Sequence, residues 1–293
     1  MKLALPIVAF LYLNWALNAQ KINTEVGHGK QAYLLGKIDK SGLEGPNYNS
    51  WFNSNYTAYK PDSSALEELS KSIGTYDIVL FMGTWCGDSK RQVPRFLKVL
   101  DGLQFPKAQL SMVALSREAD LYKQSPQHEE ASLNIHRVPT FIIYNNGKEV
   151  NRIVEEPVET LEKDLLKIIS SDTYKGHYAI VQEVDKLLKH SVKQLKRKEN
   201  KLLRTYSNKI TSMHELNTYA KILSSNNRIQ EAIAVLELNT KFFPNTAKAY
   251  LSLYQLLTTA NRNDEARVAL EKAIELDPNN EQLLNQLKSI KSR

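Results

Sequence analysis

The sequence predicts an α/β domain with a central β-sheet, followed by an all-α domain built from helical repeats. In the first half, short β-branched and aromatic runs such as "YDIVLFM" (residues 76–82) alternate with amphipathic helical patterns. In the second half, apolar residues recur at helical spacing and the pattern repeats after 34 residues. At 293 residues the chain is long enough for two such domains.

The first nineteen residues have the layout of a secretion signal. Lys2 supplies a positive charge, residues 3–17 are largely apolar, and the small residue Ala19 precedes a polar change. The apolar run is short and interrupted by Pro6 and Asn14, which argues against a membrane span. We therefore expect a signal peptide over residues 1–19 and an exported mature chain, periplasmic or extracellular, without a membrane span. A buried N-terminal strand or helix is the alternative.

Charge is unevenly distributed along the chain. Residues 21–171 contain 18 basic and 19 acidic residues, whereas residues 172–293 contain 20 and 13. The basic excess suits either an anionic partner or an ordinary solvated helix face. Because no groove-reading motif is present, we expect no nucleic-acid partner. The histidines show no metal-ligand spacing, so we expect no metal and no cofactor.

The segment "FMGTWCGDSKRQVP" (residues 81–94) contains the only cysteine of the chain, Cys86, which therefore cannot form an intrachain disulfide. It follows a predicted strand and opens a predicted helix, where free backbone N–H groups and the helix dipole stabilise a thiolate. Lys90 and Arg91 add positive charge nearby. We therefore favour a reactive thiol over a buried structural cysteine. The helix predicted after Cys86 rests on four apolar residues at helical spacing, Val93, Phe96, Leu97 and Leu100.

"WCGDSKRQVP" resembles the active-site segment of thioredoxins, Trp-Cys-Gly-Pro-Cys-Lys-x-x-x-Pro. "LNIHRVPTFIIYNNGKEVNRIV" (residues 133–154) resembles the second signature of that family, a cis-proline loop followed by a β-hairpin, and its Asn-Gly pair independently predicts the hairpin turn. The resemblance implies a thioredoxin-like fold, a mixed sheet flanked by helices, over residues 20–171. It implies catalytic positions at Cys86, Ser89 and Pro139. It implies substrate-binding positions at Trp85, Gly87, Asp88, Val138 and Thr140.

Several residues depart from the family pattern. Ser89 replaces the second cysteine, which gives a Cys-x-x-Ser site, and Asp88 replaces a proline. Leu80 stands where thioredoxins bury an aspartate that helps to deprotonate the second thiol. Glu155 falls near the position of a glycine that lines the substrate groove, and Arg137 directly precedes the Val-Pro pair.

A lone thiol performs only the first step of disulfide exchange, the formation of a mixed disulfide. Release then requires the substrate's own second thiol, which is isomerisation, or an external thiol; a persistent adduct and an oxidised sulfenic acid are the other outcomes. We expect Ser89 to hydrogen-bond the Cys86 thiolate and Pro139 to lie against the sulfur. His136 is either a base close to Cys86 or a histidine of a surface loop.

Residues 213–244 align with residues 247–278 at an offset of 34, which is the period of the tetratricopeptide repeat. Alanine at the helix crossing and proline at the end match that repeat, whereas Asn239 replaces a usual alanine. We expect tetratricopeptide repeats over residues 210–293, with a capping helix at residues 281–291, and a basic connecting helix over residues 172–209. The matching pairs are Ala232 with Ala266 and Pro244 with Pro278.

Two functions from different classes fit these observations. The first is an exported thioredoxin-like protein for thiol–disulfide exchange, in which Cys86 forms mixed disulfides with envelope or secreted proteins, or isomerises their disulfides, while the repeats dock a partner. The second is a non-catalytic protein-interaction scaffold with a vestigial redox site. The retained Trp85, Cys86 and Pro139 favour chemistry, and the lost second cysteine favours the scaffold.

Overall fold

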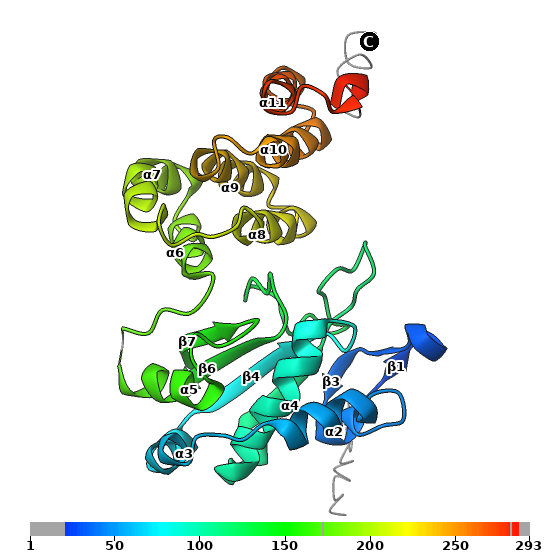
Figure 1. Ribbon diagram of the computed structural model, residues 1–293, viewed down its shortest axis with the longest axis vertical. Helices are drawn as coiled ribbons and strands as arrows, with labels where there is room; N and C mark the ends of the chain where they lie inside the picture. Colours follow the sequence, from blue (N-terminus) through cyan, green and yellow to red (C-terminus); the bar gives the residue numbers. More distant parts are fainter. Residues whose placement is uncertain (1–20, 172, 282, 287–293) are drawn as a thin grey trace, which may run out of the picture.

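The structure is a computed structural model that describes residues 21–171, 173–281 and 283–286. Figure 1 shows a sheet-containing region and, beside it, a region made of helices. The signal peptide expected over residues 1–19 lies outside the described residues, and so does most of the capping helix expected at residues 281–291. In the described part of the chain, no helix combines the length and the apolar character that a membrane span requires.

A mixed five-stranded sheet with the order β3-β5-β4-β6-β7 forms the centre of the first region. Strands β4 and β5 are parallel, and the other neighbouring pairs are antiparallel. Asn146 and Gly147, between β6 and β7, both have positive φ (49° and 73°), as a tight hairpin turn requires. The strands are β3 (Gly36–Ile38), β4 (Asp77–Met82), β5 (Leu110–Ala114), β6 (Thr140–Asn145) and β7 (Lys148–Val154), and a separate ribbon pairs β1 (Glu25–Val26) with β2 (Tyr33–Leu34).

One face of this sheet is covered by helices. Leu80 of the central strand is fully buried on this face and pairs with Met112 and Phe141, so a core leucine fills the position where thioredoxins bury an aspartate. Phe96 of α4 packs on Phe141 with 4.3 Å between the ring centroids. The helices are α1 (Lys40–Leu43), α2 (Asn49–Ala58), α3 (Ser63–Ser70), α4 (Gly87–Gly102) and α5 (Leu161–Ser170).

The opposite face is covered by the long connection between β5 and β6, residues 115–139, which contains no helix or strand. Leu133, Ile135 and Val138 of this connection pack against Phe81 and Ile142 of the sheet. Trp85 and Cys86 pack against the same cluster. The face that carries the cysteine is therefore built from irregular backbone rather than from a helix.

The helices of the second region share one hydrophobic core. The segment expected to be a basic helical connector forms two helices, α6 and α7, separated at Ser191, whose side chain accepts from Gln194 N–H. Val184 and Leu195 of these helices are buried in the common core. The helices are α6 (Ala179–Leu188), α7 (Val192–Tyr206), α8 (His214–Ser225), α9 (Ile229–Phe242), α10 (Ala247–Thr259) and α11 (Asn263–Leu276).

The repeat pattern follows from packing between paired helices. Ala232 and Ala266 are buried in α9 and α11, where a small side chain lets two helices approach closely. Asn239 is also fully buried, and its amide Nδ2 donates to Met213 O at 2.9 Å and to Asn217 Oδ1 at 2.6 Å. A polar residue therefore ties α9 to α8 at the position where the repeat usually has alanine. The mixed sheet with flanking helices, followed by the helical repeats, confirms the predicted fold class.

Candidate functional site

Cys86 lies at the N-cap position of α4, as the sequence predicts. Its thiol is partly exposed and donates to the carbonyl oxygen of Val138, with 3.2 Å between Sγ and O. Its own carbonyl accepts from Lys90 N–H at 3.0 Å, which closes the first turn of the helix. The Cys86 side chain makes no capping hydrogen bond within the described residues, so the first-turn N–H groups and the positive end of the helix dipole remain available to an anionic sulfur.

The loop that contacts the thiol contains a cis peptide bond between Val138 and Pro139. Pro139 O accepts from Glu155 N–H at 2.8 Å, and Thr140 Oγ1 donates to Arg137 O at 2.8 Å. Val138 and Thr140 are both almost completely buried. The structure thus places the Val138–Pro139 pair beside Cys86, while Thr140 supports the loop from inside.

Contrary to our expectation, the hydrogen bonds of the described residues include none between Ser89 and Cys86. The side chain is fully buried, and its Oγ accepts from Gly83 N–H at 3.2 Å. Gly83 follows the last residue of β4, so its N–H has left the strand ladder and needs another acceptor. Ser89 therefore fixes the turn between β4 and α4.

Trp85 is held beside the thiol from two sides. Its indole Nε1 donates to Leu115 O at 2.9 Å, and its ring lies 6.3 Å from the ring of Tyr122. A Cβ atom added to Gly83 would lie 2.5 Å from the indole, so the glycine is needed for this close approach. Trp85 thus links the turn between β4 and α4, which carries Cys86, to the connection between β5 and β6.

The remaining predicted groove residues lie on the first turn of α4. Gly87 is exposed, and Asp88 accepts from Arg91 Nη2 at 2.8 Å. The same guanidinium lies 3.2 Å from the carboxylate of Glu156. Two carboxylates therefore offset the positive charge that Arg91 was expected to bring to the thiol.

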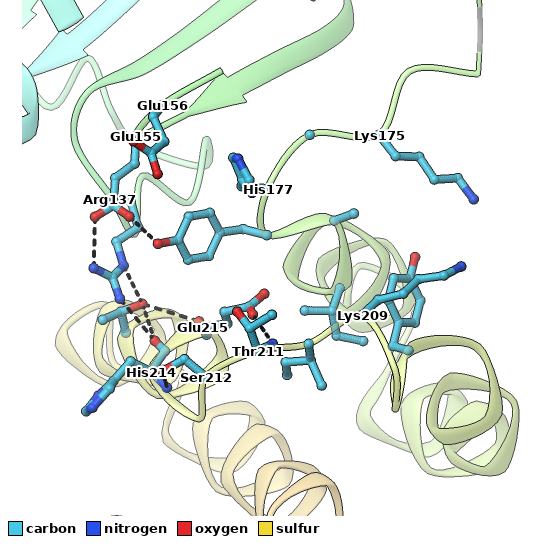
Figure 2. Close-up of a pocket in the computed structure, with 17 residues that line it drawn as sticks. Arg137, Glu155, Glu156, Lys175, His177, Lys209, Thr211, Ser212, His214 and Glu215 are labelled. Carbon is cyan, nitrogen blue, oxygen red and sulfur yellow. Dashed lines mark hydrogen bonds and ion pairs between the residues drawn. The ribbon is translucent and has the colours of Figure 1, made fainter. Parts of the chain in front are cut away.

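Arg137 joins the cysteine-bearing region to the helices, a role the sequence did not reveal. Its Nη1 donates to Glu155 Oε1 at 2.8 Å, its Nε to Thr218 Oγ1 at 3.2 Å and its Nη2 to His214 O at 3.4 Å. Its guanidinium also lies 5.2 Å from the ring centroid of Tyr178. Figure 2 shows these groups converging from the sheet side and from α8. The residue next to Val138 is therefore in direct contact with the repeats.

Glu155 completes this junction in an unusual backbone conformation. Its φ of 63° lies in the left-handed region, which fits a position where thioredoxins have glycine and costs about 1–2 kcal/mol for other residues. The carboxylate accepts from Arg137 and from the hydroxyl of Tyr178. Burial and the Glu155 charge raise the pKa of Tyr178, so its hydroxyl stays a donor. These contacts hold Glu155 against the strain.

His136 is neither a base beside Cys86 nor a surface histidine. It is 3% exposed, and its ring packs edge-on against Tyr178 and Tyr219 at centroid distances of 5.5 and 6.1 Å. Burial, followed by the charge of Lys123, lowers the pKa of His136 to about 3. The imidazole is therefore neutral and belongs to the contact between the two regions.

Lys123 is a second buried polar residue of the same connection. It is 5% exposed, has a φ of 59°, and its Nζ donates to His136 O. Burial, followed by the charge of Arg137, lowers the pKa of Lys123 to about 7. No sequence signal identified this residue, because a lysine in a polar stretch is ordinarily exposed.

A second polar contact joins the two regions at Asn134. Its Nδ2 donates to Asp185 Oδ1 at 2.5 Å, and its Oδ1 accepts from Arg228 at 3.3 Å. Tyr219 OH donates to the same Asp185 oxygen at 2.8 Å. The connection is therefore fastened to α6, to α8 and to the start of α9.

Among the hollows formed by the described residues, two bear on the site. One of about 800 Å³ lies between the two regions and is lined by Arg137, Glu155 and Glu215, whose pKa is raised by burial (Figure 2). The other, of about 500 Å³, lies between α8 and α10 and includes Lys221. Lys221 Nζ stands 4.0 Å from the ring centroid of Tyr122, the neighbour of Trp85. The hollow of the repeats therefore extends towards the cysteine-bearing face.

Comparison with known families agrees with this architecture. The sequence model of thioredoxin matches residues 63–169, and that of the tetratricopeptide repeat matches residues 247–280. The chain therefore contains a thioredoxin domain in its first region and a tetratricopeptide repeat in its second. A comparison with curated proteins found no match. Within the described residues, no group of three or more His, Cys, Asp or Glu is arranged to hold a metal ion.

Replacement of Ser89 by cysteine tests the geometry around the thiol. We expect Ser89→Cys to form a reducible disulfide with Cys86, because position 89 lies one turn along α4 in a Cys-x-x-Cys spacing. Thiol titration should find no free thiol in the oxidised variant and two after reduction. Ser70→Cys is the control: Ser70 is exposed on α3, and this variant should keep two free thiols. Two free thiols in oxidised Ser89→Cys would contradict the geometry.

The buried His136 predicts a dependence of stability on pH. Its pKa is about 3 in the folded chain against an ordinary 6.5, so between these values only the unfolded chain binds the proton. This contribution is complete above pH 6.5 and is lost as pH falls, by up to about 1.4 kcal/mol per pH unit. Urea unfolding should show a smaller loss for His136→Phe, which keeps the aromatic packing. Parallel curves for the two proteins would contradict the assignment.

Proposed function

We propose that the chain is an exported thiol–disulfide exchange protein whose nucleophile is Cys86 and whose repeats dock the partner protein. The observation that carries this proposal is the position of the Cys86 thiol. It lies at the N-terminus of α4, 3.2 Å from the carbonyl that precedes Pro139, and a serine occupies the place of a second sulfur. Such a site has the parts for attack on a disulfide but not for intramolecular release.

The exchange step is redox-neutral. The Cys86 thiolate attacks one sulfur of a substrate disulfide, the substrate S–S bond breaks, and a new S–S bond joins Cys86 to that sulfur. The other substrate sulfur leaves as a thiolate and takes up a proton. A second thiolate, from the substrate or from an external thiol, then attacks the substrate sulfur of the mixed disulfide and releases Cys86.

The residues around the sulfur have distinct roles in this proposal. The first turn of α4 stabilises the thiolate that forms before attack and after release. The Val138–Pro139 pair borders the sulfur and gives the extended substrate segment a backbone edge. Trp85, held by Leu115 O, supplies an apolar wall on the side of Tyr122. Ser89 holds the turn in shape and takes no part in bond exchange.

Export and the substrate class are part of the same proposal. The layout of residues 1–19 supports removal of a signal peptide and release of the chain into a periplasmic or extracellular space. Disulfides form and persist in such compartments, so envelope and secreted proteins are the substrates proposed. The hollow between α8 and α10 supports partner docking by the repeats, because it extends towards Tyr122 and the cysteine-bearing face.

A non-catalytic scaffold is the second candidate, and one observation favours it. Arg137 and Glu155, which border the groove side of the Pro139 loop, bond to each other and to groups of the helical region. These contacts use polar groups that would otherwise be free to bind a substrate. Under this alternative Cys86 forms no adducts, which makes the two functions distinguishable.

Trapping of adducts tests the proposal. A thiolate without a resolving partner should leave mixed disulfides that persist until another thiol arrives. After acid quenching and alkylation, isolation of the tagged chain from its own compartment should recover proteins linked through Cys86. They should disappear on reduction and be absent for Cys86→Ser. Recovery of no linked protein would favour the scaffold.

The same experiment separates docking from chemistry. Gln255 and Thr259 line the α8–α10 hollow on α10 and are exposed. Gln255→Arg with Thr259→Arg should therefore reduce the set of linked proteins, while the reaction of Cys86 with a small aromatic disulfide stays at the unsubstituted rate. An undiminished set would remove this hollow from substrate choice.

A further inference from the structure

The outer face of α7 carries an unpaired row of positive charge. Lys193, Arg197, Lys201 and Arg204 follow one another at helical spacing, so they lie on one side of the helix over about 17 Å. All four side chains are exposed, and none of them forms an ion pair within the described chain. We call these four residues the α7 basic row.

The acids and apolar residues of α7 point elsewhere. The one acid of this helix, Glu199, pairs with Lys241 of α9, and Lys196 pairs with Glu237 of α9. The exposed large hydrophobic residues of the described chain all lie outside α6 and α7. In Figure 1, α7 lies at the outer edge of the helical region.

A shallow hollow of about 250 Å³ between α6 and α7 extends the basic surface. Three lysines border it, Lys175, Lys198 and Lys201, against one acid, Glu183. Lys201 thus belongs to both the row and the hollow. The hollow is large enough for a phosphate-bearing headgroup, and the row continues the positive surface beyond it.

We propose that the α7 basic row and its hollow dock the protein onto the anionic phospholipid headgroups of a membrane surface. Charge complementarity requires an anionic occupant, and the surface is a row along a convex helix rather than a deep groove. Stable protein–protein interfaces are anchored by central aromatic or apolar side chains. In the described chain no large hydrophobic residue of α6 or α7 is exposed, and the Leu187, Leu202 and Tyr206 side chains that line the hollow are buried or half-buried. A planar array of phosphates requires no such anchor, because each basic residue contributes separately.

This docking is independent of the exchange chemistry. The row lies on α7, which packs on α6 and α9, whereas the cysteine-bearing face contacts α8 through Arg137. Attachment would hold the protein at the membrane surface without an apolar insertion, so it should weaken as salt screens the charges. Its failure would leave the proposed thiol exchange untouched.

Vesicle sedimentation tests the proposal with the chain from residue 20 onward, which keeps every described residue and omits the apolar residues 1–19. We expect binding to phosphatidylglycerol-containing vesicles, little binding to pure phosphatidylcholine, and loss of binding as salt is raised. Free glycerol phosphate at millimolar concentration should not displace the protein. Reversal of the row, Lys193→Glu, Arg197→Glu, Lys201→Glu and Arg204→Glu, should lower the partition coefficient at least 100-fold, since each basic residue contributes roughly fivefold.

A matched variant separates the row from net charge. Reversal of four exposed lysines elsewhere, Lys37, Lys60, Lys107 and Lys148, also takes the formal net charge of this chain, which lacks Lys2, from +6 to −2, two charges per substitution. It should keep most of the binding. Equal loss in both variants, equal binding to both vesicle types, or binding of a polyglutamate peptide without binding of vesicles would each overturn the proposal.

Discussion

The connection between β5 and β6 must be covered on both sides, and the rest of the structure depends on this requirement. Irregular backbone normally runs over a protein surface, where water satisfies its polar groups. Here the last part of the connection, residues 133–138, lies between the sheet and the helices: Ile135 and Val138 pack on the sheet, while Asn134 and His136 face α6 and α8. The Val138–Pro139 pair, which borders the Cys86 thiol, ends this connection. Both regions therefore determine the position of that pair.

This arrangement joins the two regions energetically. A buried lysine and a buried histidine are costly unless their surroundings keep them neutral and hydrogen-bonded, and Lys123 and His136 are both enclosed at the junction. Loss of Thr218 and Tyr219 would expose this junction to water. A deletion that begins near residue 216 therefore does not isolate an intact first region, although its strands and α5 end by Ser170. The helical region therefore packs over the connection that borders Cys86.

The sequence predicted the elements that local patterns determine. β4, the turn at Cys86, α4 and the Asn146–Gly147 hairpin follow from apolar runs, helix-start residues and turn chemistry, and the 34-residue offset predicted α8 to α11. The contacts of residues 115–139 were not predictable, because they join residues far apart in the sequence. His136 was therefore misplaced and Lys123 overlooked. From the sequence we expected the Ser89 hydroxyl to bond the thiolate. The structure shows that it accepts from Gly83 N–H instead, because β4 ends at Met82 and leaves that N–H without a strand partner.

The most direct test of this account is whether a change on α8 alters the reactivity of Cys86. Thr218→Arg places a second positive charge beside Arg137 without touching Cys86. The account predicts faster amide exchange over residues 133–139 and a change of at least threefold in the alkylation rate of Cys86. Thr259→Arg adds an equal charge at an exposed position of α10 and should change neither the amide exchange nor the alkylation rate. Unchanged exchange and alkylation in a folded Thr218→Arg protein would contradict the dependence of the site on the repeats.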